Sequence, residues 1–197
     1  MVAFTRQGKL NEAFEKAAKK NDTAAAIEAL ENGANPVDAP SGIVSAILNQ
    51  NTELFKKVLI TKSSTRLNLE IKTRHDQIKT PLELAVQYNF VEGVRLLAEQ
   101  DKTQLEKRGQ QRYDRGNNSA WKYVDNTPLE TAEKNNQTEI AYILASEMAR
   151  RMQARTDILH AKASAYETTL NAQAESHKKV ETTVNNSLGG ANGKLSI

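Results

Sequence analysis

The chain lacks cysteine, which excludes disulfides and cysteine-ligated zinc sites and is compatible with a reducing, intracellular compartment. Aromatic residues make up only 5% of the sequence, so leucine, alanine and isoleucine must supply most of the core, as a packing of thin helices requires. No apolar run is long enough for a membrane span or a signal peptide. The formal charge of +3 is too small to indicate nucleic-acid binding by itself. We therefore expect a soluble intracellular protein.

One stretch, residues 80–97, has the pattern of two short helices in succession. Thr80 can cap the first helix with its hydroxyl, and Pro81 suits the first helical position, where its missing N–H is not needed. Apolar residues recur at helical spacing on both sides of Asn89. Because asparagine tolerates the left-handed conformation, Asn89 can end the first helix. The stretch therefore predicts a pair of antiparallel helices.

Three further stretches, residues 9–35, 41–59 and 127–144, repeat this pattern. In the copy at 127–144, Thr127 takes the place of Thr80 and Ala132 that of Ala85. Across the four copies, the residue expected at the turn between the two helices is Asn21, Gln50, Asn89 or Asn136. A single helix pair cannot bury its apolar stripe alone, so the repetition predicts pairs that stack on one another.

The repeated stretches resemble ankyrin repeats. The resemblance is carried by Thr-Pro-Leu at 80–82 and 127–129 and by Leu-Glu-Asn-Gly-Ala-Asn-Pro at 30–36, and it covers residues 9–148. It implies an all-α fold, an ankyrin-repeat solenoid of about four helical pairs. Three departures are clear: Glu83 and Glu130 replace the family's histidine, asparagine or glutamine replaces the glycine of the inter-helix turn, and the spacing exceeds the usual repeat of about 33 residues. The alternative is a generic helical bundle with accidental repeats.

The extra length predicts two insertions, residues 60–79 and 101–126. Residues 67–72 alternate apolar and polar, which favours an extended finger. If equivalent loops superpose in a stack, both fingers lie at the same edge. Arginine and aromatic residues are enriched in binding surfaces, so we expect a protein partner to contact Arg74, His75, Arg112, Tyr113, Trp121 and Tyr123. The alternative is that Trp121 and Tyr123 pack under the second loop and the charges are only solvated.

The C-terminal third predicts one long helix, because no proline or glycine follows Thr138 until Gly189. Mostly apolar residues recur at alternating steps of three and four, the spacing of a heptad seam. That seam comprises Ala145, Ala149, Met152, Thr156, Leu159, Ala163, Tyr166, Leu170, Gln173, His177, Val180 and Val184. Its polar and small members are expected to make self-association through residues 145–188 weak. Three alternatives stay open: a weak coiled coil, a cap over the last repeat, or a helix that awaits a partner.

The predicted organisation is a flexible lead at 1–8, a repeat domain at 9–148, a long helix at 149–186 and a disordered tail at 187–197. The sequence gives little support for a catalytic function. The histidines His75, His160 and His177 are far apart in sequence, and none has a second ligand at metal-binding spacing. The run Gly189–Lys194 lacks the strand and helix that a phosphate-binding loop requires. We expect no enzymatic activity, no cofactor and no metal.

The resemblance to ankyrin repeats implies a non-enzymatic scaffold or adaptor that binds a protein through its concave face and finger loops. In its many Asn, Gln and Lys residues and its lone helix, the chain resembles ankyrin-type effectors that intracellular bacteria deliver into a host cell cytoplasm. One alternative is a structural oligomer assembled through the C-terminal helix. Another is binding of nucleic acid or acidic lipid by the basic fingers, against which the small net charge argues.

Overall fold

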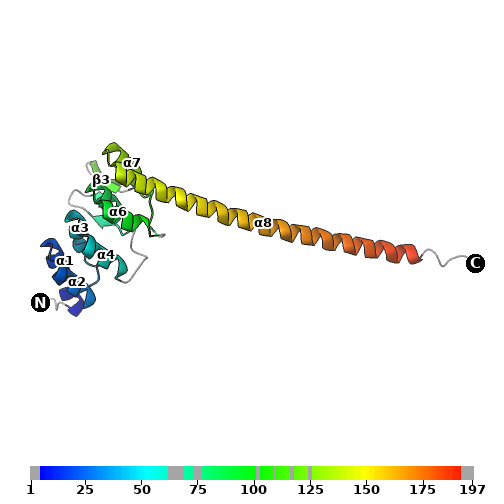
Figure 1. Ribbon diagram of the computed structural model, residues 1–197, viewed down its shortest axis with the longest axis horizontal. Helices are drawn as coiled ribbons and strands as arrows, with labels where there is room; N and C mark the ends of the chain where they lie inside the picture. The colour runs from blue at the N-terminus through cyan, green and yellow to red at the C-terminus, as the bar shows by residue number, and fades with distance from the viewer. Residues whose placement is uncertain are drawn as a thin grey trace, which may run out of the picture. The chain divides into compact units, whose positions relative to one another are not determined.

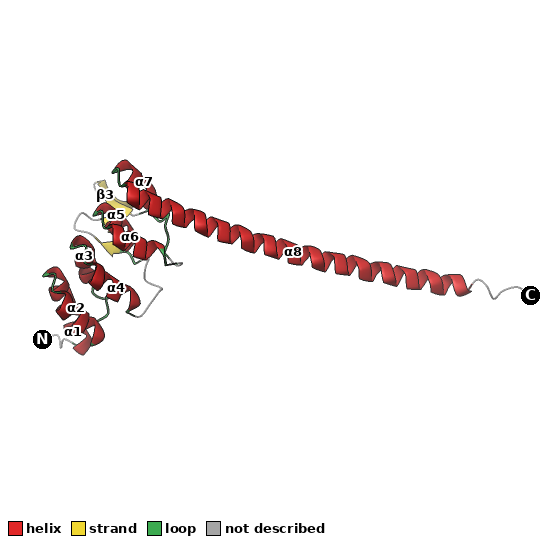
Figure 2. Ribbon diagram, in the orientation of Figure 1, coloured by secondary structure: helices red, strands yellow, loops and turns green. Residues whose placement is uncertain are grey.

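The computed structural model describes residues 5–61, 69–72, 77–100, 103–108, 110–115, 118–123 and 126–191. The chain divides into two compact units, residues 1–148 and residues 149–197. The described residues are mostly helical and include a long C-terminal helix, as predicted (Figure 1). Figure 2 shows that strands occur in addition to the helices.

Helices account for most of the described residues in both units. Their bounds are α1 Arg6–Lys19, α2 Thr23–Glu31, α3 Pro40–Leu48, α4 Thr52–Ile60, α5 Pro81–Gln87, α6 Val91–Ala98, α7 Pro128–Lys134 and α8 Thr138–Ala191. Helix α1 begins earlier than predicted, within the expected flexible lead. The reason is a cap: the Thr5 hydroxyl accepts a hydrogen bond from the Gly8 N–H at 3.2 Å, which satisfies one of the free amides of the first turn.

The turns between paired helices share one backbone geometry. The predicted turn residues all have positive φ: Asn21 58°, Gln50 49°, Asn89 52° and Asn136 57°. The amide of the residue after each of them donates a hydrogen bond to the carbonyl of an alanine five residues earlier. The bonds run from Asp22 to Ala17, from Asn51 to Ala46, from Phe90 to Ala85 and from Gln137 to Ala132. This hydrogen bond is the signature of a Schellman-type helix end. The prediction that these residues end the first helix of each pair is confirmed.

The helix pairs pack in two rows in the first unit. Helices α1, α3, α5 and α7 contact one another in succession, as do α2, α4 and α6. Between the rows lies a continuous core in which Phe55 and Phe90 meet edge to face, with ring centroids 5.6 Å apart. Such aromatic pairs contribute about 0.5–1.5 kcal/mol beyond the area they bury.

Exposed ion pairs connect the second helices. Lys57 contacts Glu31 at 2.6 Å, and Arg95 of α6 contacts Glu139 of α8 at 3.2 Å. Surface pairs of this kind contribute from zero to about 1 kcal/mol each. The first of these pairs joins α2 to α4, and the second joins α6 to the start of α8.

Helices α5 and α7 begin with the same capping box. The Thr80 hydroxyl accepts from the Glu83 N–H at 3.2 Å, and the Glu83 carboxylate accepts from the Thr80 N–H at 2.7 Å. Thr127 and Glu130 repeat these bonds at 3.2 and 2.6 Å. Glu83 and Glu130 are therefore structural, because each closes the first turn of its helix.

The two insertions form one antiparallel sheet in the order β1-β2-β3-β4. Its strands are β1 Ile71–Lys72, β2 Gln77–Lys79, β3 Gln110–Arg115 and β4 Asn118–Tyr123. Strands β2 and β3 come from different insertions and pair through Gln77 with Gln111 and Ile78 with Gln110. The prediction that the insertions are neighbours is confirmed, but they share a sheet where two separate fingers were expected.

Helix α8 runs for 54 residues, from Thr138 to Ala191. Its first turns belong to the first unit, where Ile140 and Leu144 are fully buried. The helix ends later than predicted, since it continues through Gly189 and Gly190. Glycine costs a helix about 1 kcal/mol relative to alanine but keeps its N–H, so it weakens a helix without having to end it. Residues 192–197 of the expected tail lie outside the described residues.

Candidate functional site

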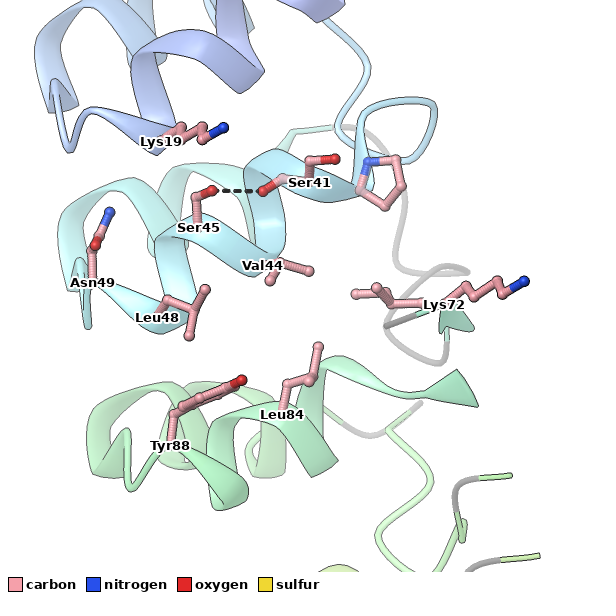
Figure 3. A pocket seen from close by; sticks show the side chains of 11 residues that line it. Lys19, Ser41, Val44, Ser45, Leu48, Asn49, Lys72, Leu84 and Tyr88 are labelled. Atoms are coloured by element: carbon pink, nitrogen blue, oxygen red, sulfur yellow. Dashed lines mark hydrogen bonds between the residues drawn. The ribbon is translucent and has the colours of Figure 1, made fainter. Parts of the chain in front are cut away.

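A groove opens in the first unit between α3 and α5, with a volume of about 530 Å³. Side chains from α1, α3, β1 and α5 and from the helix ends beside them surround it (Figure 3). The described residues that line it are Lys19, Pro40, Ser41, Val44, Ser45, Leu48, Asn49, Ile71, Lys72, Leu84 and Tyr88. The volume lies in the range of about 300–1,000 Å³ that is typical of ligand-binding pockets.

Helix α3 forms one wall because it is apolar on two faces. One face, with Ile43 and Ile47, is buried in the core. The other carries Val44 and Leu48 one helical turn apart, so both point to the groove. Leu48 is 48% exposed. An ordinary surface helix needs only one apolar stripe, so the second stripe requires a separate explanation.

The opposite wall is α5 together with Tyr88, the residue that follows its C-terminal end. Leu84 lines the groove while it is only 1% exposed, whereas Tyr88 is 39% exposed. The Gln50 side chain donates a hydrogen bond to the Tyr88 carbonyl at 3.1 Å and thereby bridges the two walls at this end. The width of the groove is fixed there by a direct contact, so the site is formed before any ligand arrives.

The rim of the groove is basic. Among the described residues that line it, Lys19 and Lys72 are charged and none is acidic. Figure 3 shows that the Lys72 ammonium is directed away from Val44 and Leu84. That leaves Lys19, at the end of α1, as the lining cation available to a ligand that lies along α3. The combination of an apolar floor and a cationic rim suits a ligand with apolar groups and a nearby carboxylate.

The groups with clearly shifted pKa values lie outside this groove. Burial lowers the pKa of Lys79, opposed by the charge of Glu83. Hydrogen bonds from the backbone and side chain of Thr127 lower the pKa of Glu130. Both groups stand at the starts of α5 and α7, where their contacts serve the fold. Their shifts give no indication of an acid–base pair at the groove.

None of the partner-binding residues predicted from sequence is among the described residues that line the groove. Arg74 and His75 lie outside the described residues. Arg112 and Tyr113 belong to β3, and Trp121 and Tyr123 belong to β4. In the register of this hairpin Arg112 is paired with Trp121, Tyr113 with Ala120 and Tyr123 with Gln110. The strands thus bring Arg112 and Trp121 together, and their role in binding stays a prediction.

Val44, Leu48 and Lys19 were not among the candidate residues predicted from the sequence. One signal was available: the segment Ile43–Leu48 is apolar at five of its six positions, with Ser45 the exception, which is more than one buried stripe needs. The gap beside this stripe depends on the distance between α3 and α5, which no local pattern encodes.

Among the described residues, no group of three or more His, Asp or Glu side chains is placed to hold a metal ion. No helix in that part of the chain is both long and apolar enough to cross a membrane. The sequence matches no protein-family model and no curated protein.

Proposed function

We propose that this protein is a non-enzymatic scaffold of the ankyrin-repeat type that binds a segment of a partner protein in the groove between α3 and α5. The observation that carries the proposal is the exposure of Leu48 and Tyr88 on facing walls of a groove of about 530 Å³. Exposed apolar side chains that gather around a concavity are typical of binding sites, whereas single exposed ones are ordinary.

The repeat family is supported by local geometry that recurs along the chain. Four turns with positive φ follow the first helices, and two of these helices begin with the same capping box. The first helices line one row of the packing, on which the groove lies. A row of rigid helices offers a pre-formed surface, so a partner loses little affinity to ordering of the scaffold.

The expected ligand is a peptide segment with two or three apolar side chains and an adjacent carboxylate. The apolar groups would occupy the space between Val44, Leu48 and Leu84, and the carboxylate would approach Lys19. An enzyme is the less favoured class, since the groove contains lysine, serine, asparagine and tyrosine without an acidic or histidine partner among its described lining residues.

The test uses a random peptide library selected on the full-length protein, followed by fluorescence polarisation of the enriched peptides. The double variant Leu48→Ala/Tyr88→Ala should weaken binding at least about tenfold, because truncation of a central anchor costs more than about 1 kcal/mol. The matched control is Ile60→Ala, since Ile60 is a 76% exposed apolar residue of α4 that does not line the groove.

Two further readouts sharpen this experiment. Lys19→Glu should weaken the binding of peptides that carry an acidic residue and leave the binding of neutral peptides nearly unchanged. Circular dichroism should show the same helix content for all variants, because the replaced side chains are exposed. Enriched peptides that bind the groove double variant as tightly as the unchanged protein would remove the groove as the binding site.

A further inference from the structure

An apolar stripe runs along the described part of α8 that belongs to the second unit. Six large apolar residues from Ala149 onward are exposed: Met152, Ile158, Leu159, Tyr166, Leu170 and Val180. Five of these six, all except Ile158, occupy the a and d positions of one heptad register. Those positions are two of every seven, so random placement would put about two of six residues there. The stripe is therefore a seam with a definite register.

A single helix of this kind gains little by remaining alone in water. Every described residue from Met152 to Val180 is exposed, so the apolar seam stabilises nothing within its own unit. Most helical stability in proteins comes from packing of an apolar face and little from intrinsic propensity. The seam fits a second helix with the same heptad spacing.

We propose that α8 pairs with α8 of a second copy of this chain in a parallel, in-register, two-stranded coiled coil over residues 149–180. The small a residues Ala149, Thr156 and Ala163 alternate with the large d residues Met152, Leu159 and Tyr166. Small residues in alternate layers let the two backbones approach, and each large residue then enters a hole on the other helix.

Charges beside the seam determine the orientation. In this register Arg155 and Lys162 occupy g positions, and Glu167 occupies an e position. Parallel helices place g of one copy against e of the other, five residues further on, which sets Lys162 against Glu167 of the second copy. Antiparallel helices place g against g and e against e, so these cations would meet only neutral residues or one another.

The polar layers of the seam favour the same arrangement. Gln173 and His177 are d and a residues, and in-register parallel pairing sets each against its own counterpart. Antiparallel pairing over the same stretch would instead set His177 against Met152. A polar residue that meets a polar residue is the usual device that specifies register and strand number in coiled coils, at a cost in stability. The proposed dimer is therefore specific and of moderate affinity.

The first experiment measures self-association of the full-length chain by analytical ultracentrifugation. The seam variant Leu159→Lys/Leu170→Lys should raise the dissociation constant by at least about 100-fold, because in two core layers it sets a lysine against the same lysine of the second copy. The matched control is Ile158→Lys/Thr168→Lys, which adds the same charge at outward c and f positions. Ile158 is 57% exposed and Leu159 is 55% exposed, so the two variants differ in heptad position and hardly in exposure.

Because a destabilised helix could also weaken association, circular dichroism accompanies each measurement. We expect the helix content of the unchanged chain to rise with concentration as the pair forms, and that of the seam variant to be lower and independent of concentration. Equal losses of association in the seam and control variants would overturn the proposal, as would a monomeric unchanged chain at every concentration. Binding of a different protein to the seam by a chain that stays monomeric would overturn it as well.

The second experiment tests orientation by oxidation of introduced cysteines, which is clean because the chain contains none. Val180→Cys should form a disulfide between two copies, because parallel pairing brings both d residues into one layer near one end of the seam. Thr182→Cys, at an outward f position, is the control and should form far less. A dimer in which Val180→Cys forms no more disulfide than this control would overturn the parallel arrangement. These variants leave the residues between α3 and α5 unchanged, so the outcome is independent of the proposed groove.

Discussion

Two successive junctions in the same row of helices are built in opposite ways. Helices α1 and α3 are closely packed. A Cβ added at Gly42 would lie only 2.2 Å from a ring carbon of the buried Phe14. Between α3 and α5 the row opens into a groove of about 530 Å³, with Leu48 and Tyr88 exposed on its walls. One helix, α3, thus has a tightly packed side and an open side.

This difference shows how successive helix pairs of similar design can differ in the space between them. Gly42 stands where the other copies have Pro81 and Pro128, and the absence of a side chain lets α1 fill the space above it. On the open side, the insertion between α4 and α5 supplies β1, whose Ile71 and Lys72 line the groove. A residue that closes one junction and an insertion that flanks the next are sufficient to make neighbouring repeats unequal.

The largest expected effect is on the closed junction. Gly42→Ala should destabilise the first unit by about 1–3 kcal/mol, because the new methyl group overlaps a ring that is buried and cannot move aside. The higher helix propensity of alanine offsets at most about 1 kcal/mol of this loss. Urea unfolding followed by circular dichroism measures it, and Phe14→Leu combined with Gly42→Ala should recover part of it.

The open side of the same helix provides the matched control. Ser45 lines the groove and donates a hydrogen bond to the Ser41 carbonyl at 2.8 Å. Ser45→Ala should change stability by no more than about 0.5 kcal/mol, since its surroundings are partly exposed. If the two substitutions destabilised the protein equally, the contrast between a closed and an open junction would be lost.

A smaller effect is expected where the far wall of the groove begins. Thr80→Ala should cost about 1 kcal/mol, because it removes the hydroxyl that accepts from the Glu83 N–H, and Thr80 is only 3% exposed. Thr80→Ser keeps the hydroxyl oxygen, so it should lower the free energy of unfolding by less than half as much as Thr80→Ala. Denaturant midpoints of the two variants measure the difference, and a serine variant as unstable as the alanine variant would assign the loss to the methyl group of Thr80.

Local chemistry made the helix pairs predictable. The turn residues Asn21, Asn89 and Asn136 could be located because left-handed backbone favours few residue types, and the structure confirms each of them. The capping boxes were also visible as threonine followed three residues later by glutamate. Glu83 was expected only as a replacement for the histidine of ankyrin repeats, so its own hydrogen bonds in the first turn of α5 were not predicted.

The features that depend on distant segments could not be predicted in detail. Pairing of β2 with β3 joins residues that more than thirty positions separate, such as Gln77 with Gln111, and short polar strands contain little information about their partner. The groove also depends on the spacing between α3 and α5. Its one local signal is the second apolar stripe of α3, which includes Val44 and Leu48.

The smallest expected effect concerns the charge of the cap on α7, the last helix of the row. Hydrogen bonds from Thr127 lower the pKa of Glu130 in the folded protein, so its ionised form stabilises the fold above the unfolded-state pKa of about 4.3 and this contribution is lost as the pH falls through the folded-state pKa. Glu130→Gln keeps an oxygen that can accept from the Thr127 N–H but has no charge to lose. The stability advantage of the unchanged protein over this variant should therefore be present at pH 6 and shrink at pH 3.

Urea midpoints of both proteins at the two pH values measure this advantage, with Glu28→Gln on the exposed side of α2 as the control for loss of any carboxylate. A difference between Glu130→Gln and the unchanged protein that stays constant with pH would show that the cap acts through its geometry alone. A difference that shrinks at pH 3 would show that capping differs from packing at the closed junction in kind as well as in size, because only the cap depends on a charge.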